Sequence, residues 1–237
     1  MRKALAALAI IAGLTAGCAP PLPRPTEPVE QVPATFPAAH YLAAIARGEP
    51  VFRIDTARSL IVIEVRRAGS LARLGHDHVV ASHDVQGYVA PKEGLADLYV
   101  PLDRLIVDEP ALRAEAGLDT KPTEADIAGT RENMLGRVLE VERFPFAFVT
   151  VSDVVPGTDN STVQIAMTLH GITRTTRMPL RIGIQNDEIA VDGSIAVKQT
   201  DFGIAPLSIL GGAIQVQDEV KLHFQIHARR CFTQSCQ

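Results

Sequence analysis

His76 and His78 are the residues whose types and spacing best suit chemistry, because they stand two positions apart in one short segment. In an extended chain, side chains alternate, so both imidazoles would point to one side and Asp77 to the other. Two imidazoles are a common part of a metal site, and His83 or Asp84 could supply a third ligand. The alternative is a polar loop or barrel rim in which histidines bond to the backbone. We favour that alternative and predict no metal or other cofactor.

The remaining polar residues form no catalytic pattern. His223 and His227 lie four apart on the expected outer face of a strand, and His170 stands beside a turn at Gly171. No serine stands in a nucleophile elbow, and no phosphate-binding loop or convergent carboxylate pair is visible. We therefore expect that the protein is not an enzyme.

The N-terminus predicts export. Two basic residues precede an apolar run over residues 4–16, which is too short to span a bilayer and is typical of a cleaved signal peptide over residues 1–17. Cys18 follows small residues, as in a bacterial lipoprotein cleavage box, although Thr15 stands where leucine is usual. Plain secretion is the alternative. Ala19 in place of aspartate favours the outer membrane, so we expect a lipid-anchored, periplasm-facing envelope protein.

A spacer and a tail flank the expected domain. Residues 18–49 hold a proline-rich segment that favours extended conformations, and we assign them as a linker. In the tail, residues 230–237, Cys231 and Cys236 have four residues between them. In an oxidising compartment they can form a disulfide, with free thiols or intermolecular pairing as alternatives.

The charge balance disfavours nucleic acid as a partner. The formal net charge is −4, and removing Arg2 and Lys3 with the signal takes it from −4 to −6. No basic run survives in the mature chain. Attachment to a membrane would therefore depend on lipid chains on the cysteine rather than on electrostatic attraction.

Residues 50–229 predict a single, mainly β domain. Apolar and polar residues alternate with period two over several runs that turn residues separate, which indicates antiparallel strands. Residues 51–54 and 60–65 suggest a hairpin, and residues 95–105 suggest a further strand. Between the strands, residues 123–140 predict a helix with Thr123 as its N-cap.

The alternation also names the side chains expected inside the domain. On the strand that begins at Phe144, the three phenylalanines share one face, opposite Ala147 and Val149. The candidates for lining a cavity are Phe144, Phe146, Phe148, Met167, Leu169, Phe202, Leu222 and Phe224. A cavity and a completely filled interior would give the same pattern.

Several short motifs, taken in order, resemble the YceI-like family of bacterial envelope proteins. The matching positions are Ile54, Asp55 and Ser59; Arg131, Met134, Leu135, Phe144, Pro145 and Phe148; Leu169, Gly171, Ile172 and Thr173; and Asp201, Phe202 and Gly203. The resemblance covers residues 50–228. It implies a lipocalin-like barrel that holds an isoprenoid chain. With the strand pattern and the inserted helix, we expect about eight antiparallel strands and a helix across one end. Arg58 and Glu132 depart from the family's usual histidine and aspartate.

Two functions remain in view from the sequence. The first is an envelope binding or carrier protein that encloses an apolar isoprenoid-type lipid, such as a quinone or a polyprenyl chain, in its barrel. Its partners would be that lipid and the membrane that holds the N-terminal anchor. The alternative is a metal- or redox-linked periplasmic protein that uses His76 and His78.

Overall fold

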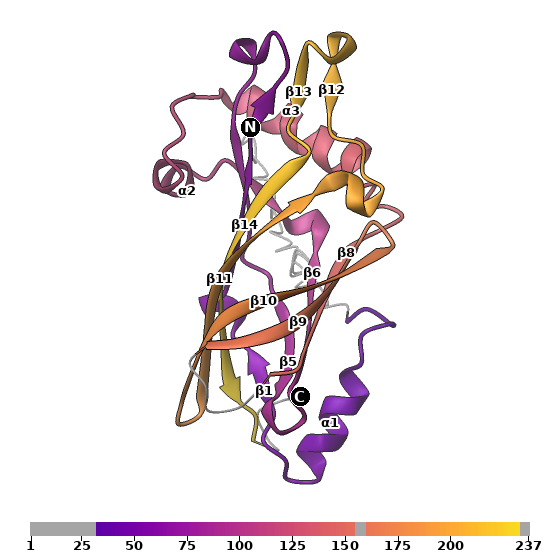
Figure 1. The fold of residues 1–237 in the computed structure, drawn as a ribbon, viewed down its shortest axis with the longest axis vertical. Helices are drawn as coiled ribbons and strands as arrows, with labels where there is room; N and C mark the ends of the chain where they lie inside the picture. Colours follow the sequence, from indigo (N-terminus) through magenta and orange to yellow (C-terminus); the bar gives the residue numbers. More distant parts are fainter. Residues whose placement is uncertain (1–31, 155–159, 233–237) are drawn as a thin grey trace, which may run out of the picture. The chain divides into compact units, whose positions relative to one another are not determined.

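A closed antiparallel barrel of eight walls forms the body of the molecule (Figure 1). The computed structural model describes residues 32–154 and 160–232. The barrel strands are β1 Phe52–Ile54, β2 Leu60–Val65, β4 His78–Ser82, β5 Gln86–Ala90, β6 Leu95–Pro101, β7 Ile106–Val107, β8 Phe146–Ser152, β9 Asn160–Leu169, β10 Ile172–Gln185, β11 Glu188–Lys198 and β14 Glu219–Arg230. Because β14 pairs back with both β1 and β2, the sheet has no open edge there, and the predicted lipocalin-like barrel is confirmed.

The strands β1 and β2 form one interrupted wall, so the predicted hairpin between them is wrong. Both run antiparallel to β14 in the same direction, and a single 3₁₀ turn, η1 Thr56–Arg58, separates them. The Ser59 hydroxyl donates to the carbonyl oxygen of Asp55 (2.9 Å) and accepts from the N–H of His227 (3.1 Å). These bonds fasten the interruption to β14, so the chain bends without reversing.

A smaller three-stranded sheet extends beyond one end of the barrel. Its strands are β3 Arg67–Ala68, β12 Ser208–Ile209 and β13 Ile214–Val216, with β13 in the centre. Two 3₁₀ turns, η2 Ala72–Leu74 and η7 Leu210–Gly212, form its loops. In Figure 1 this sheet stands at the top, beside α3. The sequence patterns did not predict it.

The predicted helix between the strands is present and starts where expected. Helix α3, Glu124–Asn133, begins after Thr123, whose side chain accepts from the N–H of Asp126 in a capping box. It continues as a π-helical turn, Met134–Val138. A short helix, α2 Pro110–Glu115, precedes it. Ile127 and Met134 pack against the barrel core, so α3 covers this end of the barrel, as its place between the strands predicted.

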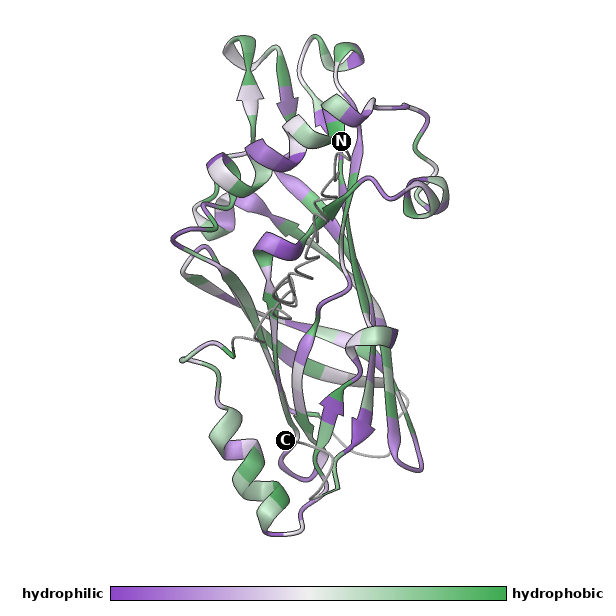
Figure 2. Cartoon of the chain, turned by 180° about the vertical axis from the view of Figure 1, so that it is seen from behind, coloured by the Kyte–Doolittle hydropathy of each residue, from purple (hydrophilic) through white to green (hydrophobic). Residues whose placement is uncertain are grey.

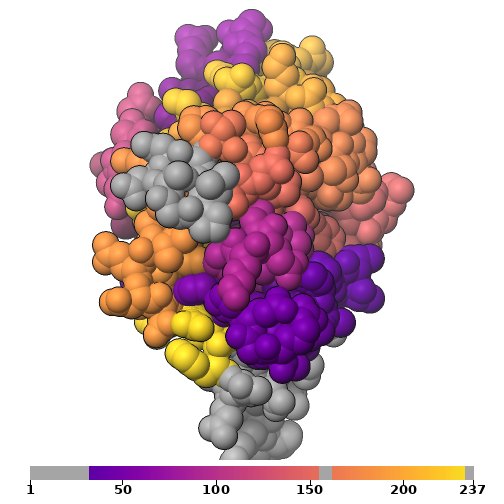
Figure 3. Space-filling model, turned by 60° about the horizontal axis from the view of Figure 1, so that its bottom comes forward, coloured from indigo at the N-terminus to yellow at the C-terminus, as the bar shows by residue number. Residues whose placement is uncertain are grey.

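Helix α1, Ala38–Ala46, packs on the outer wall of the barrel. Its side chains are mostly apolar, as the colours in Figure 2 show, and Figure 3 places it beside the connection between β5 and β6. The ring of Tyr41 stacks on Tyr88 with centroids 5.3 Å apart. The compact unit of the chain begins at Pro33, so α1 belongs to the barrel domain and not to the predicted linker.

Cys231 is buried against this outer layer and is disulfide-bonded. The predicted partner Cys236 lies outside the described residues, and so do Cys18 and the predicted signal peptide. The pairing of Cys231 with Cys236 therefore stays a prediction.

The hydroxyl of Tyr41 provides a first test of how α1 is attached. It donates to Asp97 (2.8 Å), a buried carboxylate on β6 that also accepts from Thr150. Burial, followed by this bond to Asp97, raises the pKa of Tyr41 above its ordinary value. Tyr41→Phe should lower the free energy of unfolding by about 1.5–3 kcal/mol, because a bond to a charged acceptor is lost. Urea denaturation measures this.

The matched control is Tyr88→Phe, since among the described residues the Tyr88 hydroxyl has no hydrogen-bond partner. This change should stay within about 0.5 kcal/mol of the unmodified protein. Equal losses in the two variants would contradict a specific role for the bond from Tyr41 to Asp97.

Candidate functional site: an apolar cavity inside the barrel

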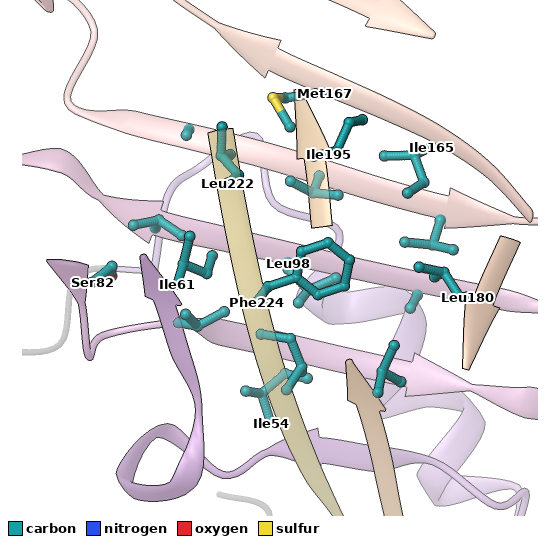
Figure 4. Close-up of a pocket in the computed structure, with 18 of the residues that line it drawn as sticks. Ile54, Ile61, Ser82, Leu98, Ile165, Met167, Leu180, Ile195, Leu222 and Phe224 are labelled. Atoms are coloured by element: carbon teal, nitrogen blue, oxygen red, sulfur yellow. The ribbon is translucent and has the colours of Figure 1, made fainter. Parts of the chain in front are cut away.

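The barrel encloses a cavity of about 240 Å³, which exceeds the roughly 150 Å³ known to admit an aromatic ring in an engineered protein core. Side chains from every wall of the barrel line it, and Figure 4 shows them converging on a common space. The labelled side chains are Ile54, Ile61, Ser82, Leu98, Ile165, Met167, Leu180, Ile195, Leu222 and Phe224. The interior is therefore not completely filled by its own side chains.

The cavity is long and narrow. At the end near α3, its lining includes Leu102, Leu139 and Leu169, and at the opposite end it includes Leu95 and Ile184. Leu95 and Val100 alone, both lining residues of β6, lie roughly 17 Å apart at the usual rise of a strand. A volume of this size spread over such a length suits a flexible chain better than a fused ring system.

Polar groups are almost absent from the lining. Ser82 is the only polar side chain among the described residues that line the cavity, and its hydroxyl accepts from the N–H of Asp84 (3.2 Å). Within the described ranges, the wall carries no charge and no hydrogen-bonding side chain without a partner. Such a lining selects a ligand by shape and apolar surface rather than by polar contacts.

Half of the predicted lining residues reach the cavity. The side chains of Met167, Leu169, Leu222 and Phe224 are part of its wall. The predicted inward faces of β9 and β14 are thus correct. The other four predicted residues, Phe144, Phe146, Phe148 and Phe202, are not part of the lining.

The predicted face of β8 is wrong. Ala147, Val149 and Val151 line the cavity, so Phe146 and Phe148 stand on the outer face of the strand. There the ring of Phe146 lies 5.9 Å from Tyr99 and 6.1 Å from Phe148.

The reason for this error is a second apolar layer outside the barrel. The N-terminal segment packs on this wall, with Phe36 4.8 Å from Tyr99. The outer face is therefore apolar over its first half, and only Thr150 and Ser152 make it more polar than the inner face. The nearby aromatic residues Tyr41, Tyr88 and Tyr99 were the available signal for an outer cluster.

Phe144 and Phe202 support turns at the α3 end of the barrel. The ring of Phe144 lies 4.3 Å from His170, which with Gly171 forms the tight turn between β9 and β10. Phe202 is buried in the turn η6 Gln199–Phe202 that follows β11, next to Gly203 with its φ of +70°. Both residues shape the ends of lining strands without entering the cavity.

Gly193 is a residue of the site that sequence reasoning missed. It pairs with Phe224 across β11 and β14, and a Cβ at this position would lie 2.6 Å from the Phe224 ring and 3.2 Å from Leu180. The absence of a side chain thus lets the ring lie against the wall. A glycine within a regular strand is the signal that could have revealed this close approach.

His78 belongs to a buried hydrogen-bond network rather than to a metal site. Its Nδ1 lies 2.6 Å from the carboxylate of Asp108, which also accepts from Arg113 (2.5 Å) and from the N–H of Val79 (3.0 Å). Nε2 of the same ring lies 3.5 Å from the hydroxyl of Thr130 on α3. The network ties β4, β7, α2 and α3 together at this end of the barrel.

The other residues proposed as ligands do not join His78. The rings of His76 and His78 have centroids 6.1 Å apart, but His83 pairs with Glu109, and Asp84 pairs with Arg104. Over residues 32–154 and 160–232, no three histidine, cysteine or acidic side chains gather closely enough to hold a metal ion.

The environment of Asp108 favours its charged form. Burial alone would raise the pKa of this carboxyl group, but the bonds from His78, Arg113 and the Val79 N–H outweigh burial and lower it. The side chain is fully buried, so its charge depends on these donors.

None of the helices within the described ranges is both long and apolar enough to cross a bilayer.

A closed up-and-down barrel of eight antiparallel walls around an apolar cavity defines the class of lipocalin-like barrels.

The sequence model of the YceI-like domain matches residues 52–228, and the chain belongs to that family. Among curated proteins, none matches the sequence.

Two solved structures share the fold. A polyisoprenoid binding domain from Saccharophagus degradans, implicated in plant cell wall breakdown, is 14% identical with a TM-score of 0.55, covering 76% of this chain and 98% of that one. BcnA from Burkholderia cenocepacia is 15% identical with a TM-score of 0.53, covering 73% of this chain and 98% of that one.

Proposed function

We propose that this protein is a binding or carrier protein, and not an enzyme, which encloses an isoprenoid-type chain such as a quinone tail or a polyprenyl lipid. The observation that carries the proposal is the long, narrow cavity of about 240 Å³ with an apolar wall. The similar domain from Saccharophagus degradans is described as binding a polyisoprenoid, which supports the same ligand class.

The energetics suit such a ligand. Each methylene moved from water into the cavity contributes about 0.8 kcal/mol, so a few isoprene units provide micromolar affinity without any polar contact. Because lining residues are spread along the length of the barrel, the cavity suits a slim, flexible chain. A polar head, if the ligand has one, would stay outside the apolar wall.

We further propose that the protein resides in the cell envelope as a lipid-anchored, periplasm-facing protein. The signal-like residues 1–17, Cys18 and the proline-rich segment after it support this location. Mass spectrometry of the mature protein tests it: an acylated N-terminal Cys18 is expected, and an intact N-terminus at Met1 would contradict it.

Extraction tests the ligand class directly. Purified protein is extracted with organic solvent, the extract is analysed by mass spectrometry, and uptake of an added fluorescent prenyl lipid is measured in parallel. We expect an isoprenoid in the extract or saturable uptake by the emptied protein. Neither an apolar compound in the extract nor any uptake would refute the proposed function.

Reducing the volume of the cavity should weaken prenyl-lipid uptake. Ala147→Leu adds three carbons on the cavity face of β8, so prenyl-lipid uptake should fall at least tenfold, because the ligand loses buried methylenes. The matched control is Phe148→Ala on the outer face of the same strand. It should lower stability by roughly 3 kcal/mol or less and leave affinity unchanged. If Phe148→Ala weakened prenyl-lipid binding and Ala147→Leu did not, the face of β8 that carries Phe148 would be the inner one.

A further inference from the structure

Two loops that are distant in the sequence meet beyond the α3 end of the barrel (Figure 1). We call residues 69–75 and 207–213 the tip loops. They carry Leu74 and Leu210, whose exposed fractions of 62% and 71% are the largest among the large apolar side chains of the described residues. Ile209, beside Leu210, is 43% exposed.

The tip loops are held together as one structure. The N–H of Leu71 donates to the carbonyl oxygen of Ala213 (2.8 Å), and β3 pairs with β13 directly below. Gly69 has a φ of +93°, and a Cβ there would lie 2.4 Å from the same oxygen of Ala213. The two exposed leucines therefore belong to a single, closely packed tip.

Leu210 combines a strained backbone with an exposed side chain. Its φ is +51°, in the left-handed region where a residue other than glycine costs about 1–2 kcal/mol. Since the side chain is mostly exposed, packing within the described chain does not offset this cost. Strain without compensating contacts is a feature of functional surfaces.

The tip is also depleted in charge. Of the whole chain, 21% is Asp, Glu, Lys or Arg, yet the tip loops contain a single charged residue, Arg73. Arg73 is exposed, and no carboxylate among the described residues pairs with it. The charge within the tip loops is thus a cation, and just below them Arg67 donates to the carbonyl oxygen of Gly75 and pairs with Asp119.

We propose that the tip loops are a docking surface for a lipid bilayer with anionic headgroups. Leu74, Ile209 and Leu210 enter the boundary between headgroups and acyl chains, while Arg73 reaches a lipid phosphate. Charge complementarity supports this occupant, because the single charged residue within the tip loops of an otherwise acidic protein is a cation. Scattered exposed apolar residues such as Leu42 are ordinary, whereas a joined apolar tip is not.

Vesicle sedimentation tests the proposal with residues 33–237, the compact unit, so that no lipid anchor contributes. The vesicles contain phosphatidylcholine with or without phosphatidylglycerol and carry no prenyl lipid, so the result does not depend on the cavity. The tip variant is Leu74→Ser with Leu210→Asn. Asparagine tolerates a positive φ, so this variant should keep its melting temperature.

The matched control is Leu42→Ser with Ile106→Ser, two apolar residues that are each 44% exposed outside the tip. We expect the tip variant to bind vesicles at least tenfold more weakly, because each leucine that leaves hydrocarbon costs about a factor of ten or more. The control should bind like the unmodified domain. Arg73→Gln should reduce the preference for phosphatidylglycerol about fivefold.

Three results would overturn the proposal: no vesicle binding by the unmodified domain, equal binding by the tip variant, or an equal loss in the control. Prenyl-lipid uptake from detergent is measured separately on the same variants. Uptake that persists while vesicle binding fails rejects the docking surface alone. Vesicle binding without uptake rejects the proposed function alone.

Discussion

Replacing Asp108 with asparagine is expected to lower the free energy of unfolding by about 3–5 kcal/mol. Asp108 is fully buried at a φ of 60°, which asparagine also accepts, so the change removes the charge and keeps the backbone. Arg113, only 10% exposed, then loses its carboxylate partner, and His78 loses its acceptor. An unpaired buried guanidinium is the main source of the loss.

Urea denaturation measures this effect, with Asp187→Asn as the control. Asp187 also pairs with an arginine, Arg230, but both side chains are largely exposed, so that change should cost less than about 1 kcal/mol. If the two variants lose the same amount, burial of the Asp108 pair has no special effect.

The same network predicts a loss of stability in acid. The pKa of Asp108 is lowered in the folded protein, so its stabilising effect is complete above the ordinary carboxyl pKa of about 3.9. It declines as the pH falls from there through the lower folded value. In Asp108→Asn, this part of the acid dependence should be missing, which denaturation at several pH values would reveal.

Gly193→Ala is expected to weaken binding of a prenyl chain at least tenfold. The added Cβ would lie 2.6 Å from the ring of Phe224 and 3.2 Å from Leu180, so the ring must move. Phe224 lines the cavity, and the strand closes the space behind it. The ring can therefore move only into the lumen, where it displaces the equivalent of several methylenes of ligand.

A second substitution separates this effect from misfolding. Phe224→Leu in the Gly193→Ala background removes the ring edge and should restore uptake. The control glycine is Gly183 on β10, where a Cβ would meet only a carbonyl oxygen at 3.8 Å, and Gly183→Ala should bind normally. Fluorescence titration with prenyl lipids of graded length measures all three. Normal binding by Gly193→Ala would show that the Phe224 ring can move without entering the cavity.

The barrel could be predicted from the sequence because most of its strands have one polar face. On β14, Lys221, His223 and Gln225 alternate with Leu222 and Phe224, so the inner face is unambiguous. The N-cap at Thr123 could also be predicted, because a capping box depends on two residues only three positions apart. Each of these features rests on neighbours in the sequence.

The failures concern contacts between distant residues. On β8, Phe146 and Phe148 stand beside the outer layer that Phe36 joins, and these two rings outweighed Thr150 and Ser152 on the same face when the inner face was predicted. The hairpin between β1 and β2 was wrong because both strands pair with β14, more than 150 positions later. Asp108 bonds to His78, thirty positions earlier, and no periodic pattern in the sequence indicates a pair at that separation.

The attachment of α1 has a mechanical consequence. A pull on the chain from its N-terminal side reaches the ring stack and hydroxyl bond of Tyr41, on β5 and β6, before it reaches β1. Strand β1 pairs with β14 and closes the barrel, so it is the strand that tension would open first. Helix α1 therefore transfers tension from the N-terminal side to β5 and β6, and the pairing between β1 and β14 is protected.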